Sequence, residues 1–189
     1  DGDSMRFPPA IAIAEQRLID AGGEAFAVGG CVRDALLGRP CHDYDLTTNL
    51  PPARVIEAFA GYTVVPTGLR HGTVTVHIDG LPIDVTTYRI DGAYADGRHP
   101  AEVRFTGSLE DDLRRRDFTM NAVCHSAGRG FVDPFGGIGD IRAGRIRCVG
   151  DPHERFSEDA LRILRAVRFA AQLGFAVEPE TARAMYETA

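Results

Sequence analysis

The chain has 189 residues, of which 44% are hydrophobic and 25% are charged. These values are typical of one globular domain with a real core, or of a domain followed by the start of another. The apolar runs are far shorter than the ~20 residues that a membrane helix needs, and no charged-then-apolar leader opens the chain. We therefore expect no membrane segment, no signal peptide and a cytoplasmic protein. Residues 1–4, which precede Met5, are expected to be a remnant of expression outside the fold.

Charge and cysteine content narrow the function classes. The formal net charge is −6, whereas a protein surface that binds RNA along its length is usually basic. If RNA is the substrate, either local basic patches bind it or the main RNA-binding part lies outside this chain. The cysteines at positions 31, 41, 124 and 148 form no CxxC pair, so we expect reduced thiols rather than disulfides or a zinc site.

The first part of the chain alternates helical and strand-like patterns. Apolar residues recur at helical spacing in residues 11–21, and Gly22 and Gly23 end that helix. Asp79 and Gly80 predict a hairpin turn inside a segment rich in Val, Thr and Ile. The predicted elements, in chain order, are helix 11–21, strand 25–28, helix 32–37, strand 44–48, helix 52–59 and strands 62–65, 72–78 and 81–88. Residues 90–100, which include glycines and a proline, predict a mobile loop.

The second part is predominantly helical. From Leu109 onward the pattern predicts helix, interrupted by Asp-Pro-Phe-Gly-Gly at residues 133–137 and by a short strand at 145–149. The clearest helix spans residues 156–173, and another begins at Pro179. We therefore predict a mixed α/β domain over residues 5–150 and the start of a helical domain over residues 151–189.

Two carboxylates stand one residue apart at the predicted strand 44–48. Because residues i and i+2 of a strand point to the same face, Asp43 and Asp45 project together, while Tyr44 projects the other way. Two like charges this close are unfavourable unless a cation lies between them, and Mg²⁺ bound by carboxylates and substrate phosphates meets that need. An isolated Asp-x-Asp is also typical of a solvated strand end. Asp84, polar among apolar neighbours, faces either solvent or the same site as a third carboxylate.

A glycine turn upstream predicts a phosphate site. Gly29 and Gly30 join a strand to a helix, where glycines let the backbone approach a phosphate and the helix N-terminus offers N–H donors. Arg33 adds a charged donor, although a tight turn with Arg33 and Asp34 as a surface ion pair is the competing interpretation. A phosphate site shortly before a metal-binding carboxylate pair is what nucleotidyl transfer requires.

These segments resemble the motifs of a known family, the class II tRNA nucleotidyltransferases (CCA-adding enzymes) and bacterial poly(A) polymerases. Four motifs occur in the family's order and cover about residues 25–175, which is far more specific than any one of them. They are motif A in residues 29–34 with 43–45, motif B in 115–122, the short following motif in 133–137 and the base-reading motif in 158–162.

The resemblance implies an α+β fold. It is a polymerase beta-like nucleotidyltransferase head with a small mixed, mainly antiparallel sheet and flanking helices, followed by a helical neck. The implied activity is template-independent addition of CMP and AMP, from CTP and ATP, to the 3′ end of tRNA, with release of pyrophosphate. Asp43 and Asp45 would hold two Mg²⁺ ions with Asp84 as a third catalytic carboxylate, and the parts that hold most of the tRNA would lie outside this chain.

The resemblance also implies nucleotide-binding residues. Motif A contributes phosphate contacts, motif B contacts the triphosphate and ribose, and the last motif reads the base and faces the triphosphate. These residues are Gly29, Gly30 and Arg33, then Arg116, Asp117 and Asn121, then Asp159, Arg162, Arg165 and Arg168.

The base-reading helix also has a predicted orientation. Apolar residues gather on one stripe, which we expect to face the core: Ala160, Ile163, Leu164, Val167 and Ala171. Asp159 and Arg162, three residues apart, would be neighbours on the remaining surface and could pair with a base edge as acceptor and donor. A salt-bridged solvent face is the competing interpretation.

Other activities remain open beside CCA addition. Residues 71–76 and 84–89 resemble the CCA-adding type rather than the bacterial poly(A) polymerases. Residues 90–100 are similar to a flexible loop that enzymes restricted to CC addition lack. The sequence does not separate CCA addition from addition of A alone, and poly(A) tailing or a nucleotide- or RNA-binding head without catalysis are the remaining alternatives.

Overall fold

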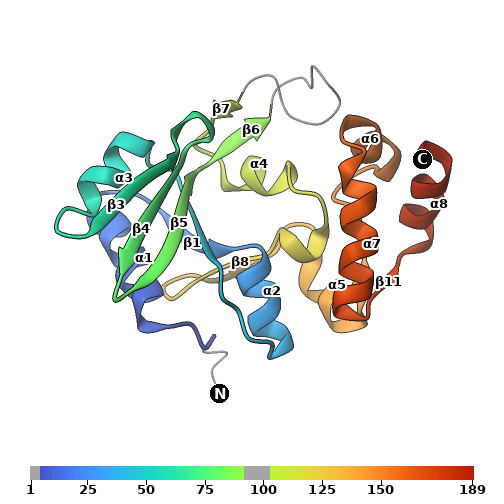
Figure 1. Cartoon of the computed structure of the whole chain (residues 1–189), viewed down its shortest axis with the longest axis horizontal. Helices are drawn as coiled ribbons and strands as arrows, with labels where there is room; N and C mark the ends of the chain where they lie inside the picture. The colour runs from blue at the N-terminus through green and yellow to red at the C-terminus, as the bar shows by residue number, and fades with distance from the viewer. Residues whose placement is uncertain (1–4, 92–102) are drawn as a thin grey trace.

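The computed structural model describes residues 5–91 and 103–189, and its centre is one seven-stranded sheet (Figure 1). The strand order is β3-β4-β5-β2-β1-β8-β9. β2 and β5 run parallel and the other neighbouring pairs are antiparallel, which confirms the mixed, mainly antiparallel sheet. The strands are β1 (Ala25–Val28), β2 (Tyr44–Thr48), β3 (Thr63–Gly68), β4 (Thr73–Ile78), β5 (Leu81–Thr87), β8 (Cys124–Ser126) and β9 (Gly130–Val132).

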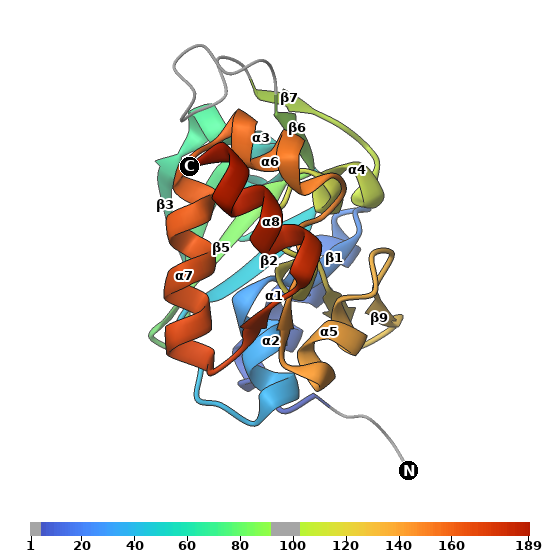
Figure 2. The ribbon, with the colours of Figure 1, turned by 90° about the vertical axis from the view of Figure 1, so that its right-hand side faces the viewer.

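Helices flank this sheet. In Figure 1 the sheet occupies one side of the molecule and α6, α7 and α8 the other, with α2 between them; Figure 2 shows α7 and α8 in front of the sheet. The helices are α1 (Pro9–Asp20), α2 (Gly30–Leu37), α3 (Pro52–Ala58), α4 (Leu109–Arg114), α5 (Gly137–Ala143), α6 (Pro152–Glu158), α7 (Leu161–Leu173) and α8 (Pro179–Thr188), with 3-10 turns η1 (Leu69–His71) and η2 (Thr119–Asn121). Two small sheets pair β6 (Arg89–Asp91) with β7 (Val103–Phe105), and β10 (Arg145–Ile146) with β11 (Ala176–Val177).

The two faces of β4 and β5 differ in character. Val74 and Val76 of β4 and Ile83 and Val85 of β5 are fully buried in the core, and each contributes about 1.5–3 kcal/mol of hydrophobic stabilisation. The alternate residues point to the other face and, apart from Pro82, are polar. There the side chains of threonine and aspartate bond to one another across the strands: Thr73 to Thr86, and Thr75 to Asp84. One face therefore fixes the sheet, and the other presents a polar surface beside β2.

A close contact positions η2. A Cβ on Gly137, the first residue of α5, would lie 2.1 Å from the carbonyl oxygen of Thr119 and 2.6 Å from Val123. Only glycine allows α5 to pack this closely against η2. The packing holds Asn121, at the end of η2, next to the start of α2.

The helical pattern predicted from Leu109 onward is partly wrong. After α4 and η2, the chain forms the hairpin β8–β9, which extends the sheet on the side of β1. Gly130, with φ 72°, opens β9 after the turn. Both strands are three residues long, which is too short for an alternating pattern to be visible in the sequence.

The predicted helix 156–173 is two helices. α6 ends at Glu158, Asp159 is extended with φ −150° and ψ 103°, and α7 begins at Leu161. The Asp159 carboxylate accepts a hydrogen bond from the Leu161 backbone N–H at 3.0 Å. Aspartate competes in this way with the helical hydrogen-bond ladder, which explains the break.

The apolar stripe of α7 does not face the core, so the predicted orientation is wrong. Leu164 is 65% exposed and Val167 is 55% exposed, whereas Arg162, Ala166 and Phe169 are buried. Of the other predicted core positions, Ala160 and Ala171 are exposed and Ile163 is half-buried. The inward face of α7 instead combines apolar residues that pack against the core, Ala166, Phe169, Ala170 and Leu173, with the buried Arg162.

The remaining expectations concern the domain boundary, the loop at residues 90–100, residues 1–4 and the membrane segment. The boundary at residue 150 stays a prediction, and β10 and β11 pair across it. Residues 92–100 of the predicted loop and residues 1–4 lie outside the described residues, while residues 90 and 91 belong to β6. In the described ranges, no helix combines the length and apolar character that crossing a membrane requires.

Candidate active site

A pocket of about 870 Å³ opens between the polar face of the sheet, the start of α2, η2 and α7. All of the predicted site residues except two line it. The lining includes Gly29, Gly30, Arg33, Asp43, Asp45, Arg116, Asp117, Asn121, Asp159, Arg162 and Arg165. Residues that are far apart in the sequence are therefore brought into one cavity, although their individual roles stay predictions.

The carboxylate pair has the predicted arrangement. Asp43, just before β2, and Asp45, within it, both line the pocket. Between them Tyr44 turns away, since its hydroxyl donates to the Cys41 carbonyl at 3.2 Å and its ring packs edge-on against Phe7. The two acidic side chains thus open onto one cavity.

Burial disfavours the ionised form of the Asp45 carboxyl. Desolvation first, and the nearby Asp84 next, raise the pKa of Asp45 to about 6; Arg116 opposes this rise and Asp43 adds to it. A partly buried carboxylate with two acidic neighbours gains much from a bound cation. Asp43 and Asp45 therefore fit a divalent ion that takes its remaining oxygen ligands from water and phosphate.

Asp84 lies beside the pair but does not line the pocket. It is opposite Asp45 in the parallel β2–β5 register, so both carboxylates are on the same face of the sheet. The Thr75 hydroxyl donates to Asp84 at 2.6 Å. In residues 5–91 and 103–189, no group of three or more His, Cys, Asp or Glu side chains is placed to hold a metal together. A metal role for Asp84 stays a prediction.

The glycine turn opens onto the pocket, and its phosphate role stays a prediction. Gly29 has φ 81° and ψ −137°, a conformation that favours glycine. It is the N-cap of α2 and lines the pocket. The first N–H groups of a helix have no acceptor within the helix and can bind an anion. Arg33, which is buried, is held at the pocket wall by the Asn121 side chain at 2.9 Å. The ion pair of the competing interpretation, Arg33 with Asp34, also forms at 3.0 Å, but it does not lie on the surface because Arg33 is buried.

Side chains of motif B, α7 and α2 contact one another at the pocket wall. The Asp117 carboxylate accepts from Asn121 at 3.2 Å and from Arg165 at 2.7 Å. The Phe169 ring contacts the guanidinium groups of both Arg33 and Arg165, each 5.2 Å from the ring centroid. Stacking on an aromatic face holds a guanidinium in place while its edge remains able to bind a ligand.

The proposed base-reading pair meets in the pocket by a route that the sequence did not indicate. Asp159 lies between α6 and α7 rather than on a common helix with Arg162. Arg162 is buried and donates to the Glu158 carboxylate and to the Arg155 carbonyl, both at 2.9 Å. Arg168, the other predicted residue outside the pocket, is exposed one turn beyond Leu164, on the solvent side of α7.

Sequence reasoning missed part of the lining. The residues are His71, Thr73, Arg89, Asp91, Arg115 and Phe169. Phe169 stands four residues after Arg165, and helical spacing could have placed it on the same face. Arg89 and Asp91 belong to β6, which ends just before residues 92–102, and only the three-dimensional structure shows that they line the same pocket as the carboxylates.

Comparison with known proteins gives a family. The model of the poly A polymerase head domain matches residues 25–147. The CCA-adding enzyme of Pediococcus pentosaceus is 49% identical over 172 residues, which are 91% of this chain and 43% of that protein. The CCA-adding enzyme of Limosilactobacillus fermentum is 47% identical over 183 residues, which are 97% of this chain and 45% of that protein.

Solved structures that resemble this chain come from the same group of enzymes as the sequence relatives. The Bacillus stearothermophilus CCA-adding enzyme in complex with CTP has a TM-score of 0.84 and 43% identity over 94% of this chain and 43% of that chain. A tRNA nucleotidyltransferase complexed with a primer tRNA and an incoming ATP analog has a TM-score of 0.74 and 32% identity over 93% of this chain and 49% of that chain. The chain thus spans less than half the length of these relatives, and it belongs to the poly A polymerase head domain family.

Proposed function

We propose that this chain is the catalytic head of a tRNA nucleotidyltransferase of the CCA-adding type. It would transfer CMP and AMP from CTP and ATP to the 3′ end of tRNA. The observation that carries the proposal is that one pocket gathers the carboxylate pair, the glycine turn, motif B and the Asp159–Arg162 pair. The names of the similar proteins support the same activity: one is a CCA-adding enzyme in complex with CTP, and another is a tRNA nucleotidyltransferase complexed with a primer tRNA and an incoming ATP analog.

Different pocket residues would serve different steps of this reaction. Asp43 and Asp45 would hold Mg²⁺, which lowers the pKa of the RNA 3′-hydroxyl and neutralises charge on the triphosphate. The 3′-oxygen bonds to the α-phosphorus, the bond from the α-phosphorus to the bridging oxygen breaks, and pyrophosphate leaves. Gly29, Gly30 and Arg33 bind phosphate oxygens, so that the reacting groups are held in line.

The remaining residues orient the nucleotide. Arg116 contacts the triphosphate, while Asp117 and Asn121 face the ribose. Asp159 offers an acceptor and Arg162 a donor to the base edge, and Glu158 fixes the Arg162 guanidinium at 2.9 Å. Because the side chains of this pair are held by protein contacts, they can select a base without a nucleic-acid template.

Product length separates this proposal from its rivals. The intact protein is incubated with Mg²⁺, CTP, ATP and a tRNA that lacks its last three nucleotides, and the products are sequenced. We expect addition to stop after CCA. Extension of only those tRNAs that already end in CC would indicate an A-adding enzyme.

A poly(A) polymerase is the second candidate, because the matching family model carries that description. An open-ended A tail would establish it. CTP binding without incorporation on any acceptor would instead indicate a binding module. Replacing Asp43 by Ala should abolish incorporation, whereas replacing Asp20, an exposed carboxylate on α1 remote from the pocket lining, should not. Unchanged turnover in the Asp43 variant would refute the metal role.

A further inference from the structure

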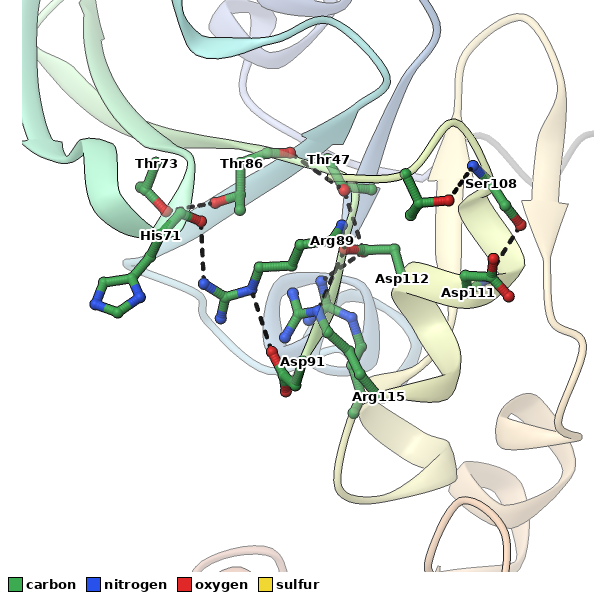
Figure 3. A network of polar contacts seen from close by, with 12 residues as sticks. Thr47, His71, Thr73, Thr86, Arg89, Asp91, Ser108, Asp111, Asp112 and Arg115 are labelled. Atoms are coloured by element: carbon green, nitrogen blue, oxygen red, sulfur yellow. Dashed lines mark hydrogen bonds and ion pairs between the residues drawn. The ribbon is translucent and has the colours of Figure 1, made fainter. Parts of the chain in front are cut away.

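A fully buried carboxylate stands behind the arginines of the pocket. Asp112, on α4, has no exposed surface and is not part of the pocket lining. It accepts hydrogen bonds from the Thr47 hydroxyl at 3.2 Å, the Arg89 backbone N–H at 3.1 Å and the Arg115 guanidinium at 3.3 Å (Figure 3). The Arg116 guanidinium donates to it as well, at 3.3 Å. One side chain thus joins the carboxylate-bearing strand β2, the start of β6 and motif B.

The arginines around Asp112 repel one another. Arg89, Arg115 and Arg116 all line the pocket, and their guanidinium charges are crowded. Burial first, and Arg116 next, lower the pKa of Arg115 to about 10, and Asp112 acts in the opposite direction. Without a buried counter-ion, such a cluster would spread or would turn its charges outward into water.

The bond to Asp112 also sets where Arg116 points. Its Nη2 atom is bonded to Asp112, while its Nη1 atom reaches the glycine turn, 3.7 Å from the position that a Cβ on Gly29 would occupy. The guanidinium therefore spans the distance from the buried carboxylate to the phosphate site. Fixing the donor before the ligand arrives removes the cost of ordering it on binding.

We infer that Asp112 is a positioning residue for the triphosphate: its carboxylate orients Arg115 and Arg116 toward the β- and γ-phosphates and ties them to β2 and β6. This inference rests on the nucleotide site of the proposed function. Asp112 itself does not touch the nucleotide. It acts through the two arginines, so its loss affects ligands that carry a triphosphate and spares ligands that lack one.

The test compares CTP with CMP. Calorimetric affinities for both nucleotides are measured with the intact protein in Mg²⁺, for the wild type and for Asp112→Asn, which keeps the shape and removes the charge. We expect CTP affinity to fall by about tenfold or more and CMP affinity to change by less than about threefold, because CMP lacks the two phosphates at issue. Equal losses for both nucleotides, or no loss of CTP affinity, would overturn the inference.

The fold offers a matched control. Asp140 on α5 is another buried carboxylate, which accepts from the Thr119 hydroxyl at 2.6 Å and pairs with Arg145 at 3.0 Å and Arg147 at 3.3 Å, and it does not line the pocket. Asp140→Asn should lose comparable stability in urea unfolding without selective loss of CTP affinity. Selective CTP loss in this control as well would mean that any buried ion pair has the same effect, and would overturn the inference.

Two further variants guard against misfolding of Asp112→Asn. Asp112→Glu keeps the counter-ion but displaces it by one methylene, and we expect it to fold and to lose CTP affinity by about threefold. Asp112→Glu and Asp112→Asn are also made in the Arg116→Gln variant. There, each should cause less than half of the loss of CTP affinity that it causes in the otherwise wild-type protein. Wild-type CTP affinity in Asp112→Glu, or full additivity with Arg116→Gln, contradicts the inference. If the wild-type protein binds no CTP, the proposed function fails instead.

Discussion

The raised pKa of Asp45 gives a stability prediction that needs no assumption about the reaction. The pKa of this carboxyl rises from its ordinary value of 3.8 to about 6, mainly through burial. A group whose pKa is higher in the folded than in the unfolded protein contributes stability below its unfolded pKa and loses that contribution as the pH rises through its folded pKa. In metal-free buffer the stability of the wild type should therefore fall between about pH 4 and pH 6 because of Asp45.

Replacing Asp45 by Asn removes this dependence. At about 1.4 kcal/mol per pKa unit, a rise of about two units corresponds to at most about 3 kcal/mol. Asp45→Asn should therefore be more stable than the wild type by up to about 3 kcal/mol at pH 8, and the difference should vanish near pH 4. The measurement is urea unfolding in EDTA across this pH range.

The control is Asp43→Asn, because Asp43 is exposed and a surface change of this kind is within about 0.5 kcal/mol. Addition of Mg²⁺ and CTP should reverse the order, since the wild type gains binding energy that the Asp45 variant lacks. If Asp45→Asn is equal to the wild type or less stable at pH 8 in EDTA, then burial does not disfavour this charge and the electrostatic argument for a cation site is wrong.

Two other substitutions test the contacts that hold the pocket wall in place. Phe169→Leu should weaken CTP binding by about tenfold, because Arg33 and Arg165 lose the aromatic ring that both contact, while the free energy of unfolding changes by about 1.5 kcal/mol or less. Calorimetry and urea unfolding measure the two effects, and undiminished CTP affinity would show that the aromatic contact is incidental. Gly137→Ala should lower the free energy of unfolding by about 2 kcal/mol or more, because its Cβ would meet the Thr119 carbonyl oxygen at 2.1 Å; a variant as stable as the wild type in thermal unfolding would show that α5 can move away from η2 without cost.

Local patterns predicted much of this protein. The alternation of Val and Ile in β4 and β5 reports burial directly, and the period of two along β2 places Asp43 and Asp45 on one side. The glycine turn is equally local. These features depend only on residues a few positions apart, so one sequence is enough to find them.

The face of α7 could not be predicted in the same way. Its inward side borders a charged pocket, so Arg162 is buried through Glu158 and Arg155, while Leu164 is exposed. A second apolar set at helical spacing, Ile163, Ala166, Ala170 and Leu173, packs against the core, and periodicity alone does not distinguish it from the set that contains Leu164 and Val167. The error in orientation follows from the presence of two apolar sets on one helix, of which only one faces the core.

The network at Asp112 is a second feature that depends on distant residues. Its partners lie as far as 65 positions away in the chain, at Thr47, and the sequence alone shows only an acidic residue in a charged helix. Neither the charge of Asp112 nor its spacing from Arg116 distinguishes it from the exposed pair formed by Glu110 and Arg114. Burial, which only the tertiary structure supplies, makes the difference.

The most direct test of the central claim is the location of a divalent ion in the complex with CTP. Crystals of the intact protein grown with CTP and Mn²⁺ allow the ion to be located by its anomalous scattering. The account predicts Mn²⁺ within about 2.0–2.3 Å of oxygens from both Asp43 and Asp45, with the CTP phosphates completing its coordination over the Gly29 turn. Mn²⁺ and CTP bound elsewhere, or CTP in the pocket with neither carboxylate contacting the ion, would contradict it.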